Sequence, residues 1–255
     1  MMKKNNLLPE ENVDEKSVRK RSIISFSIFL IMLLLGYFTW VWINNQPKDQ
    51  GVLKPLRKVL NVNEKIFSAV FDSTKLVREY PISEAAKRVR VNGREGIRDS
   101  VNENTWLLNV IKTNGDTLKI TLEELKQLPK KDIIFDFKCI EGWSQITHWA
   151  GVPLKEFMKH YHLENEAMKA YVGMSTPDKG YYVGIDMKSA LHQQTILCYE
   201  MNGKPLPLIQ GYPLRLIIPV KYGVKHIKRI GTMYFSNSKP ADYWAERGYD
   251  YYTGH

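Results

Sequence analysis

The sequence contains few cysteines and no repeats. Only two cysteines occur among 255 residues, too few for a disulfide scaffold, so each needs its own explanation. Internal repeats, low-complexity segments and basic helices with interleaved aromatic residues are also missing from the pattern. Because a nucleic-acid interface needs such a clustered basic surface, the formal charge of +10 does not predict a nucleic-acid partner. Most of the cations are expected on the solvated surface.

One long segment lacks charge. Residues 23–43 contain no charged residue and no proline, and as a helix they would span about 30 Å, the thickness of a bilayer core. The run is longer than the apolar core of a signal peptide, and no small-residue cleavage site follows it, so an uncleaved transmembrane anchor is favoured. Cations lie just before the span at Lys16, Arg19, Lys20 and Arg21.

These cations predict the orientation of the anchor. By the positive-inside rule, residues 1–22 form a cytoplasmic basic tail, and everything after the span lies outside the cell membrane, in the periplasm or its equivalent. Lys20-Arg21 also resembles a twin-arginine export signal, with lysine in place of the first arginine. Simple positive-inside charges explain the same residues equally well.

The residues after the anchor predict a linker and one domain. Residues 44–60 carry proline and glycine, as linkers do, and the roughly 200 residues of 61–255 suffice for one buried core. Helices are expected at 61–71 and 154–161, and strands are expected in the ranges 106–111, 117–120, 133–139, 170–174, 195–199, 214–218 and 226–235. Because strands and helices do not alternate regularly, we predict an α+β fold with mixed β-sheets and short helices.

Cys139 lies at the end of a strand with two-residue periodicity. Ile133, Phe135, Phe137 and Cys139 share one face, and Gly142 ends the strand, so the thiol points inward beside a turn that a ligand can approach. The residues alone leave three roles open: a small core residue, a nucleophile with a histidine base, or a metal ligand. The nearby histidines lack the ligand spacing of a zinc site. The other cysteine, in the apolar pattern T-I-L-C-Y, is expected in the core.

A second element runs from residue 211 to 225, with the sequence G-Y-P-L-R-L-I-I-P-V-K-Y-G-V-K. Arg215 interrupts an apolar strand and needs an anionic partner there. Gly223 lets backbone N–H groups approach a ligand, and Lys221, Lys225 and Lys228 add positive charge. These residues fit a phosphate or pyrophosphate cradle, and they fit a surface strand with snorkelling lysines equally well.

A family resemblance covers roughly residues 90–250. The segment 139–154, C-I-E-G-W-S-Q-I-T-H-W-A-G-V-P-L, resembles the molybdenum-ligand segment of the sulfite-oxidase-type molybdopterin domain. The segment 211–225 resembles that family's pterin-phosphate segment, and the turn at 202–206, N-G-K-P-L, lies between them as it does in the family. Within this family, the chain resembles the bacterial periplasmic methionine-sulfoxide reductase catalytic subunits.

The resemblance implies a sulfite-oxidase-type molybdopterin-binding domain with a molybdenum-molybdopterin cofactor. Cys139 matches the molybdenum thiolate and is the expected catalytic and metal-binding residue. Cofactor-binding positions are expected at Asn92, Thr176, Gln210, Arg215, Gly223, Val224 and Lys225. Gln210 stands where the reductases have asparagine, so an amide is kept with different geometry. The family's amino-terminal cofactor segment is not recognisable, and the segment 90–93, which contains Asn92, is expected to replace it.

The implied activity is two-electron or oxygen-atom transfer on a small S- or N-oxide type substrate. No haem motif occurs, so electrons are expected from a separate protein, such as a membrane haem or quinone-linked partner. Sulfite is less favoured, because Glu141-Gly142-Trp143 replaces a basic segment and little chain remains for a dimerisation domain. Candidates to line the pocket are Glu141, Trp143, Ser144 and His148. The alternatives are a cofactor-free binding module on the same fold, a sulfite-oxidising enzyme and a cysteine hydrolase.

Overall fold

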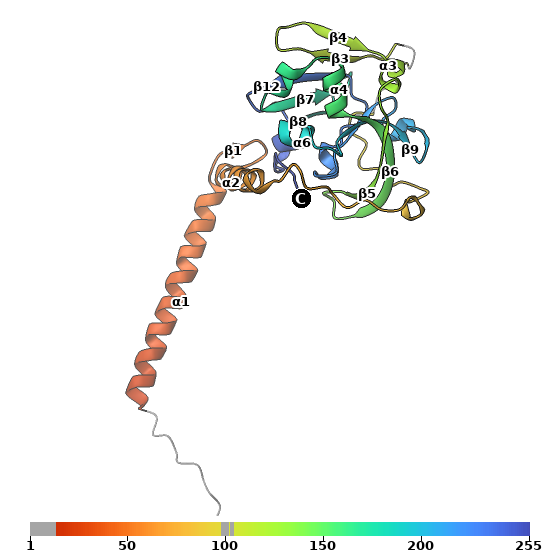
Figure 1. The fold of residues 1–255 in the computed structure, drawn as a ribbon. Coiled ribbons are helices and arrows are strands. Elements are labelled where there is room, and N and C mark those ends of the chain that lie inside the picture. Colours follow the sequence, from red (N-terminus) through yellow and green to blue (C-terminus); the bar gives the residue numbers. More distant parts are fainter. Residues whose placement is uncertain (1–13, 98–101, 103–104) are drawn as a thin grey trace, which may run out of the picture. The chain divides into compact units, whose positions relative to one another are not determined.

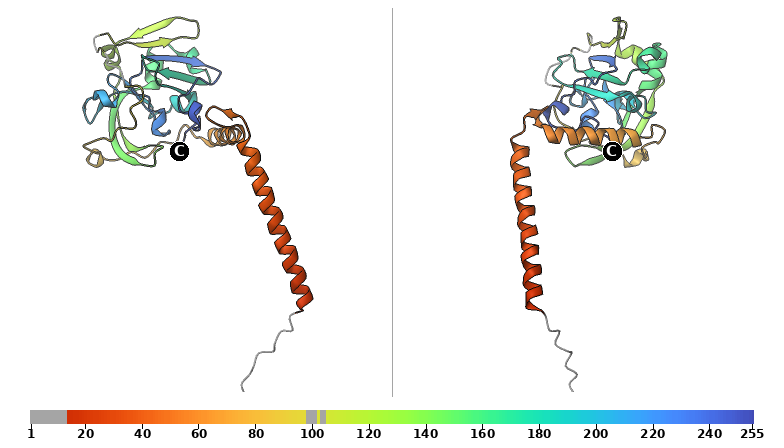
Figure 2. Two further views of the ribbon diagram at one scale, coloured as in Figure 1. Left: turned by 180° about the vertical axis from the view of Figure 1, so that it is seen from behind. Right: turned by 90° about the vertical axis from the view of Figure 1, so that its left-hand side faces the viewer.

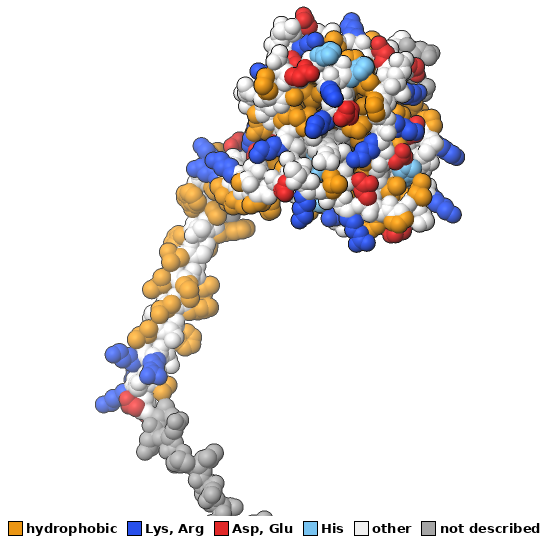
Figure 3. Space-filling view, in the orientation of Figure 1, with side chains coloured by type: hydrophobic (Ala, Val, Ile, Leu, Met, Phe, Trp, Pro, Cys, Tyr) orange, Lys and Arg blue, Asp and Glu red, His pale blue; other side chains and the backbone are white. Residues whose placement is uncertain are grey.

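The computed structural model describes residues 14–97, 102 and 105–255, which divide into two compact units (Figure 1). Helix α1 (Glu15–Asn44) dominates the first unit, and the side chain of Asp14 caps it by accepting a hydrogen bond from the Lys16 N–H. No residue of α1 is buried, and its apolar window has a mean hydropathy of 2.1. Hydrophobic side chains surround the helix, with basic side chains at its amino end (Figure 3). By length and composition, this helix is apolar enough to cross a membrane.

The second unit is built on two five-stranded sheets. The first is antiparallel, in the order β10-β9-β6-β5, with β11 also pairing with β9. Its strands are β5 (Lys131–Lys138), β6 (Ser144–Pro153), β9 (Ile196–Met201), β10 (Lys204–Pro205) and β11 (Arg215–Ile217). Lys138 pairs with Ser144, so residues 139–143 form the turn of the β5–β6 hairpin. This turn carries Cys139.

The second sheet has the order β4-β3-β12-β7-β8. Its strands are β3 (Leu108–Ile111), β4 (Thr117–Ile120), β7 (Tyr171–Ser175), β8 (Tyr182–Asp186) and β12 (Thr232–Ser236). Only the pair of β12 and β3 is parallel among these described strands. The β3–β4 hairpin and the curved β5–β6 hairpin lie at opposite ends of the unit (Figures 1 and 2). The mixture of antiparallel sheets and short helices confirms the α+β prediction.

Short helical segments connect the strands. Before the sheets, the chain forms β1 (Lys48–Asp49), β2 (Val52–Leu53) and α2 (Lys54–Val70). The later helices are α3 (Leu122–Lys126), α4 (Leu154–His160), α5 (Glu164–Ala167) and α6 (Met187–Ala190), and single 3₁₀ turns occur at Ile82–Glu84, Leu208–Gln210, Gly223–Lys225 and Ala245–Arg247. Helix α3 begins with a capping box, in which the side chains of Thr121 and Glu124 accept hydrogen bonds from each other's backbone N–H groups.

Three elements differ from the sequence prediction. Helix α2 begins at Lys54, earlier than the helix expected at 61–71. The hydrophobic periodicity did not predict this start, because the residues that α2 buries, Arg57 and Glu64, are polar. The strand expected at 226–235 begins only at Thr232, since the preceding residues form a loop that carries buried cations. Strand β6 was not anticipated, because its buried run from Thr147 to Val152 shows no simple alternation.

Candidate active site

The turn between β5 and β6 presents Cys139 to a pocket. Phe135 and Phe137 are buried on the same face of β5, and Cys139 continues that face with 6% exposure. Its N–H donates to the Trp143 carbonyl (2.9 Å), and its carbonyl accepts from the Gly142 N–H (3.1 Å). Gly142 has a φ of +87°, a left-handed conformation that glycine adopts without strain. Burial raises the pKa of the Cys139 thiol, so a thiolate there needs a nearby positive charge or metal.

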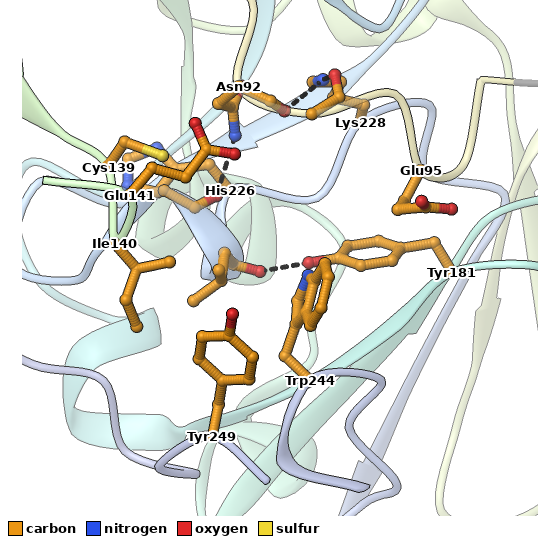
Figure 4. Close-up of a pocket in the computed structure, with 13 residues that line it drawn as sticks. Asn92, Glu95, Cys139, Ile140, Glu141, Tyr181, His226, Lys228, Trp244 and Tyr249 are labelled. Atoms are coloured by element: carbon orange, nitrogen blue, oxygen red, sulfur yellow. Dashed lines mark hydrogen bonds between the residues drawn. The ribbon is translucent and has the colours of Figure 1, made fainter. Parts of the chain in front are cut away.

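The pocket is a hollow of about 560 Å³, a volume that includes its open mouth. Cys139, Ile140 and Glu141 form one side (Figure 4). The aromatic rings of three distant residues form the other side: Tyr181, Trp244 and Tyr249. The rest of the wall consists of Asn92, Gly93, Glu95, Gly223, Val224, His226 and Lys228. The pocket thus combines one thiol with an aromatic wall and a polar wall.

Arg215 is a fully buried cation behind the polar wall. Its guanidinium donates to the backbone and side-chain oxygens of Gln210 (both 3.0 Å) and to the Asn92 Oδ1 (3.4 Å), and it lies 4.5 Å from the centre of the Trp149 ring. Burial lowers its pKa to about 10, so it remains a cation at neutral pH. Its Nε is buried without a partner, and no carboxylate of the described residues lies within 4 Å. This arrangement leaves positive charge available for an anionic ligand.

Lys228 supplies a second cation in the wall itself. Its Nζ donates to the carbonyls of Asn92 (2.6 Å) and Gly93 (2.7 Å), which ties this segment across the pocket. Burial, and then the nearby Arg215 charge, lower the pKa of Lys228 to about 7. Asn92 is held by three hydrogen bonds: its backbone carbonyl accepts from Lys228, its Oδ1 accepts from Arg215, and its Nδ2 donates to the Gly223 carbonyl (3.0 Å).

The 3₁₀ turn Gly223–Lys225 brings backbone close to the pocket. A Cβ on Gly223 would lie 3.0 Å from the Phe137 ring and 3.4 Å from the Asn92 amide nitrogen, so a larger residue would have to displace them. The carbonyl of Val224 accepts a hydrogen bond from the Tyr181 hydroxyl (2.5 Å). Gly223 therefore permits the close approach of Phe137 and Asn92, and its approach to a ligand stays a prediction.

The structure brings together most, but not all, of the expected site residues. Cys139, Asn92, Gly223 and Val224 line the pocket, and Gln210 and Arg215 stand directly behind Asn92. The side chains of the other two expected residues point elsewhere. Thr176 accepts the Tyr181 N–H (3.1 Å) and donates to Asp178, and Lys225 donates to Asp242 (2.5 Å) and the Gly184 carbonyl (2.9 Å).

Of the four residues proposed to line the pocket, one does so. Glu141 lies in the wall and accepts the Trp143 Nε1–H (2.9 Å). Trp143 stacks on Phe137 with ring centres 5.8 Å apart, and Ser144 is exposed at the start of β6. His148 points away to Asp132, at 2.7 Å. Closeness to Cys139 in sequence therefore did not predict closeness to the pocket, because the Trp143 ring packs on Phe137 and the His148 side chain bonds to Asp132.

Sequence reasoning missed the aromatic wall and His226. Tyr181, Trp244 and Tyr249 come from the start of β8 and from the carboxyl-terminal segment, and their role depends on tertiary packing. The density of aromatic residues in 243–252 was the available signal. The His226 imidazole is kept neutral, because burial and then the Arg215 charge lower its pKa to about 3.

The side chains around Cys139 distinguish between a nucleophile, a metal site made by the protein alone, and a metal held by an organic cofactor. Both ring nitrogens of His226 have backbone partners, the Lys221 carbonyl (3.1 Å) and the Ile218 N–H (3.5 Å), so this imidazole is not placed as a base for Cys139. Among the described residues, no group of three or more His, Cys, Asp or Glu side chains could hold a metal. One thiol beside buried cations instead fits a metal whose other ligands belong to an anionic organic cofactor.

Comparisons with known proteins agree with this geometry. Residues 95–244 match the family model "Oxidoreductase molybdopterin binding domain". The "Putative protein-methionine-sulfoxide reductase subunit YedZ1" of Azospira oryzae is 34% identical over 209 residues, which cover 81% of this chain and 78% of that protein. The protein-methionine-sulfoxide reductase catalytic subunit MsrP of Xanthomonas axonopodis pv. citri is 33% identical over 150 residues, which cover 52% of this chain and 47% of that protein. The chain thus spans about half the length of that catalytic subunit.

A solved structure shares the fold. The sulfane dehydrogenase SoxCD of Paracoccus pantotrophus superimposes with a TM-score of 0.50 and 17% sequence identity, covering 55% of this chain and 40% of that one. At this identity the likeness concerns the fold alone. The predicted sulfite-oxidase-type fold is confirmed.

Proposed function

Because the chain belongs to the family of oxidoreductase molybdopterin-binding domains, we propose that it is a membrane-anchored molybdenum enzyme that reduces S-oxides, with methionine sulfoxide as the first candidate substrate. The single observation that carries this proposal is the buried Cys139 thiol in a pocket with two buried cations, Lys228 in its wall and Arg215 behind that wall, neither of which lies within 4 Å of a carboxylate of the described residues. A soft thiolate is a fitting protein ligand for a metal held by a dithiolene.

Each part of the pocket receives a role in this proposal. Cys139 is the protein ligand to molybdenum, and Asn92, Gly223 and Val224 contact the pterin. Arg215 and Lys228 balance the negative charge of the cofactor, and Gln210 orients Arg215. Thr176 and Lys225 would act through backbone groups or through Tyr181, because their side chains are bonded elsewhere. When bound, the cofactor supplies two-electron transfer, usually with an oxygen atom.

The walls of the pocket favour a neutral substrate over sulfite. Glu141 beside Cys139 disfavours an incoming anion, and the aromatic rings of Tyr181, Trp244 and Tyr249 suit the apolar groups of a sulfoxide. We propose that electrons come from a separate membrane haem or quinone-linked protein, and that α1 anchors the chain with its catalytic domain outside the cytoplasm. The cations before the span support this orientation.

Replacement of Cys139 tests the proposal. The full chain, made in a host that synthesises molybdenum cofactor, is assayed for bound molybdenum and for reduction of a sulfoxide panel with a reduced dye as electron donor. We expect Cys139→Ser to lose turnover while its circular dichroism is unchanged. Cys198→Ala is the matched control, because Cys198 is equally buried but lies away from the pocket, within β9.

Specific outcomes would overturn each part. Normal turnover in Cys139→Ser would reject the ligand assignment. Folded wild-type protein without molybdenum would favour a cofactor-free binding module, and faster oxidation of sulfite than reduction of any sulfoxide would favour the sulfite-oxidising alternative. Loss of molybdenum from Cys198→Ala would show that the wrong thiol had been chosen.

A further inference from the structure

Helix α2 attaches to its domain through polar residues. The Arg57 side chain is buried and donates to three carbonyls, those of Gln50 (2.7 Å), Ala245 (2.6 Å) and Tyr249 (3.0 Å). About two turns further on, Glu64 is buried and pairs with Lys239. A helix of a water-soluble domain normally buries its apolar side, so this attachment is inverted.

The apolar side of α2 faces outward. Its exposed apolar residues recur at helical spacing and are 46 to 72% exposed: Leu56, Val59, Val62, Ile66, Phe67 and Val70. They form a continuous stripe along the helix, which would be about 25 Å long. Six large apolar residues on one exposed face are a patch that marks an interaction surface.

The place of α2 in the chain identifies what can cover this stripe. Only nine residues, 45–53, separate its start from the end of α1, so at most about 30 Å of extended chain connects the two helices. Lys54, Lys58 and Lys65 are exposed next to the stripe. Basic residues beside an apolar stripe are the composition of helices that lie in a membrane surface, where the lysines reach the lipid headgroups.

We propose that α2 lies in the surface of the bilayer that α1 crosses, with its apolar stripe among the lipid acyl chains and its lysines at anionic headgroups. This rests on the membrane-anchor part of the proposed function. The proposal also explains why α2 contacts its domain through polar residues. Arg57 ties the helix to the carbonyls of residues 245 and 249, and the Tyr249 ring forms part of the pocket wall. Docking of α2 would therefore hold the aromatic edge of the pocket in a fixed relation to the membrane surface.

Fluorescence quenching by lipids tests this docking. The full chain is reconstituted in vesicles of phosphatidylethanolamine and phosphatidylglycerol, with an environment-sensitive dye on an introduced cysteine, Ile66→Cys. Both natural cysteines are buried, and unmodified protein serves as the labelling blank. The matched control is Lys65→Cys, which differs by one position on the same helix and lies beside the stripe, where the proposal places it at the headgroups and not among the acyl chains. We expect quenchers attached to the acyl chains to quench the dye at residue 66 several-fold more than the dye at residue 65.

Equal quenching at the two positions would overturn the proposal. Resistance of the chain to alkaline extraction is measured on the same vesicles and reports on α1 alone. Equal quenching in chains that resist extraction would reject only the docking of α2, whereas extraction of the chain would reject the anchor and the docking with it. Shielding of the dye at residue 66 that depends on protein concentration and not on the lipid quencher would assign the stripe to a second copy of the chain, which also overturns the proposal.

Discussion

Two groups of buried cations lie on the same segment of the chain and have opposite surroundings. Lys221 and Lys225 each meet a carboxylate, at 2.8 Å from Asp186 and 2.5 Å from Asp242. Arg215 and Lys228 meet only carbonyl and amide oxygens among their hydrogen-bond partners. A carboxylate neutralises the charge of a buried cation, whereas neutral partners leave a positive electrostatic potential around it. The comparison separates the cations that hold the fold from those available to a ligand.

The largest loss of stability should come from breaking the buried ion pair of Lys225 and Asp242. Asp242→Asn leaves the Lys225 ammonium buried without its counter-charge, which typically costs about 3 kcal/mol or more. The Asn side chain can still accept the hydrogen bond from the Ala245 N–H, so the loss of that bond does not account for the expected effect. Urea unfolding measures the free-energy change. A value below that of Asp186→Asn, whose partner pair is less deeply buried, would contradict the structural role of this pair.

A buried cation without a carboxylate partner should behave in the opposite way. Arg215→Met removes the charge but keeps an unbranched side chain over Trp149, so folding should be affected less than in Asp242→Asn. We expect cofactor content to fall about ten-fold or more, equivalent to about 1.4 kcal/mol of binding energy. Pterin fluorescence after release and metal analysis measure it, with Arg78→Met on the exposed surface as control. Unchanged cofactor content would make Arg215 a structural cation like Lys225.

Acid should break the buried ion pair of Lys221 and Asp186 by protonating the carboxylate. Burial alone would raise the pKa of Asp186, but the Lys221 ammonium and the Ser189 hydrogen bond hold it below its usual value. A carboxyl group whose pKa is lower in the folded protein stabilises it fully above the unfolded value, about 3.9, and this stabilisation is lost as the pH falls through the folded value. Urea midpoints below pH 5 should therefore fall less steeply in Asp186→Asn than in the wild type. Parallel slopes would show that Lys221 does not depend on this charge.

The sequence predicted which residues are buried near the site better than it predicted which residues they contact. The alternation in β5 placed Cys139 on the buried face, and an arginine within an apolar strand indicated a buried charge at Arg215, because both signals are local. Which lysine faces the pocket was not local information. Lys225 and Lys228 are three residues apart, yet the first turns to Asp242 and the second to Asn92, and only the fold decides this. The aromatic wall needed residues about 40 to 110 positions from Cys139.

The smallest effect is expected from a polar residue that is near Cys139 in sequence but bonded outside the pocket. His148 lies on β6 and contacts Asp132 (2.7 Å), whose side chain is 52% exposed. Since a pair with one solvated partner contributes about 0 to 1 kcal/mol, His148→Gln should change stability by no more than this. Its sulfoxide turnover and cofactor content should equal those of the wild type, whereas Lys228→Gln, the same replacement in the pocket wall, should lower cofactor content. If His148→Gln lost turnover as Cys139→Ser is expected to, the histidine would act in the pocket after all. Closeness to Cys139 in sequence would then indicate the site better than the hydrogen-bond partners in the structure do.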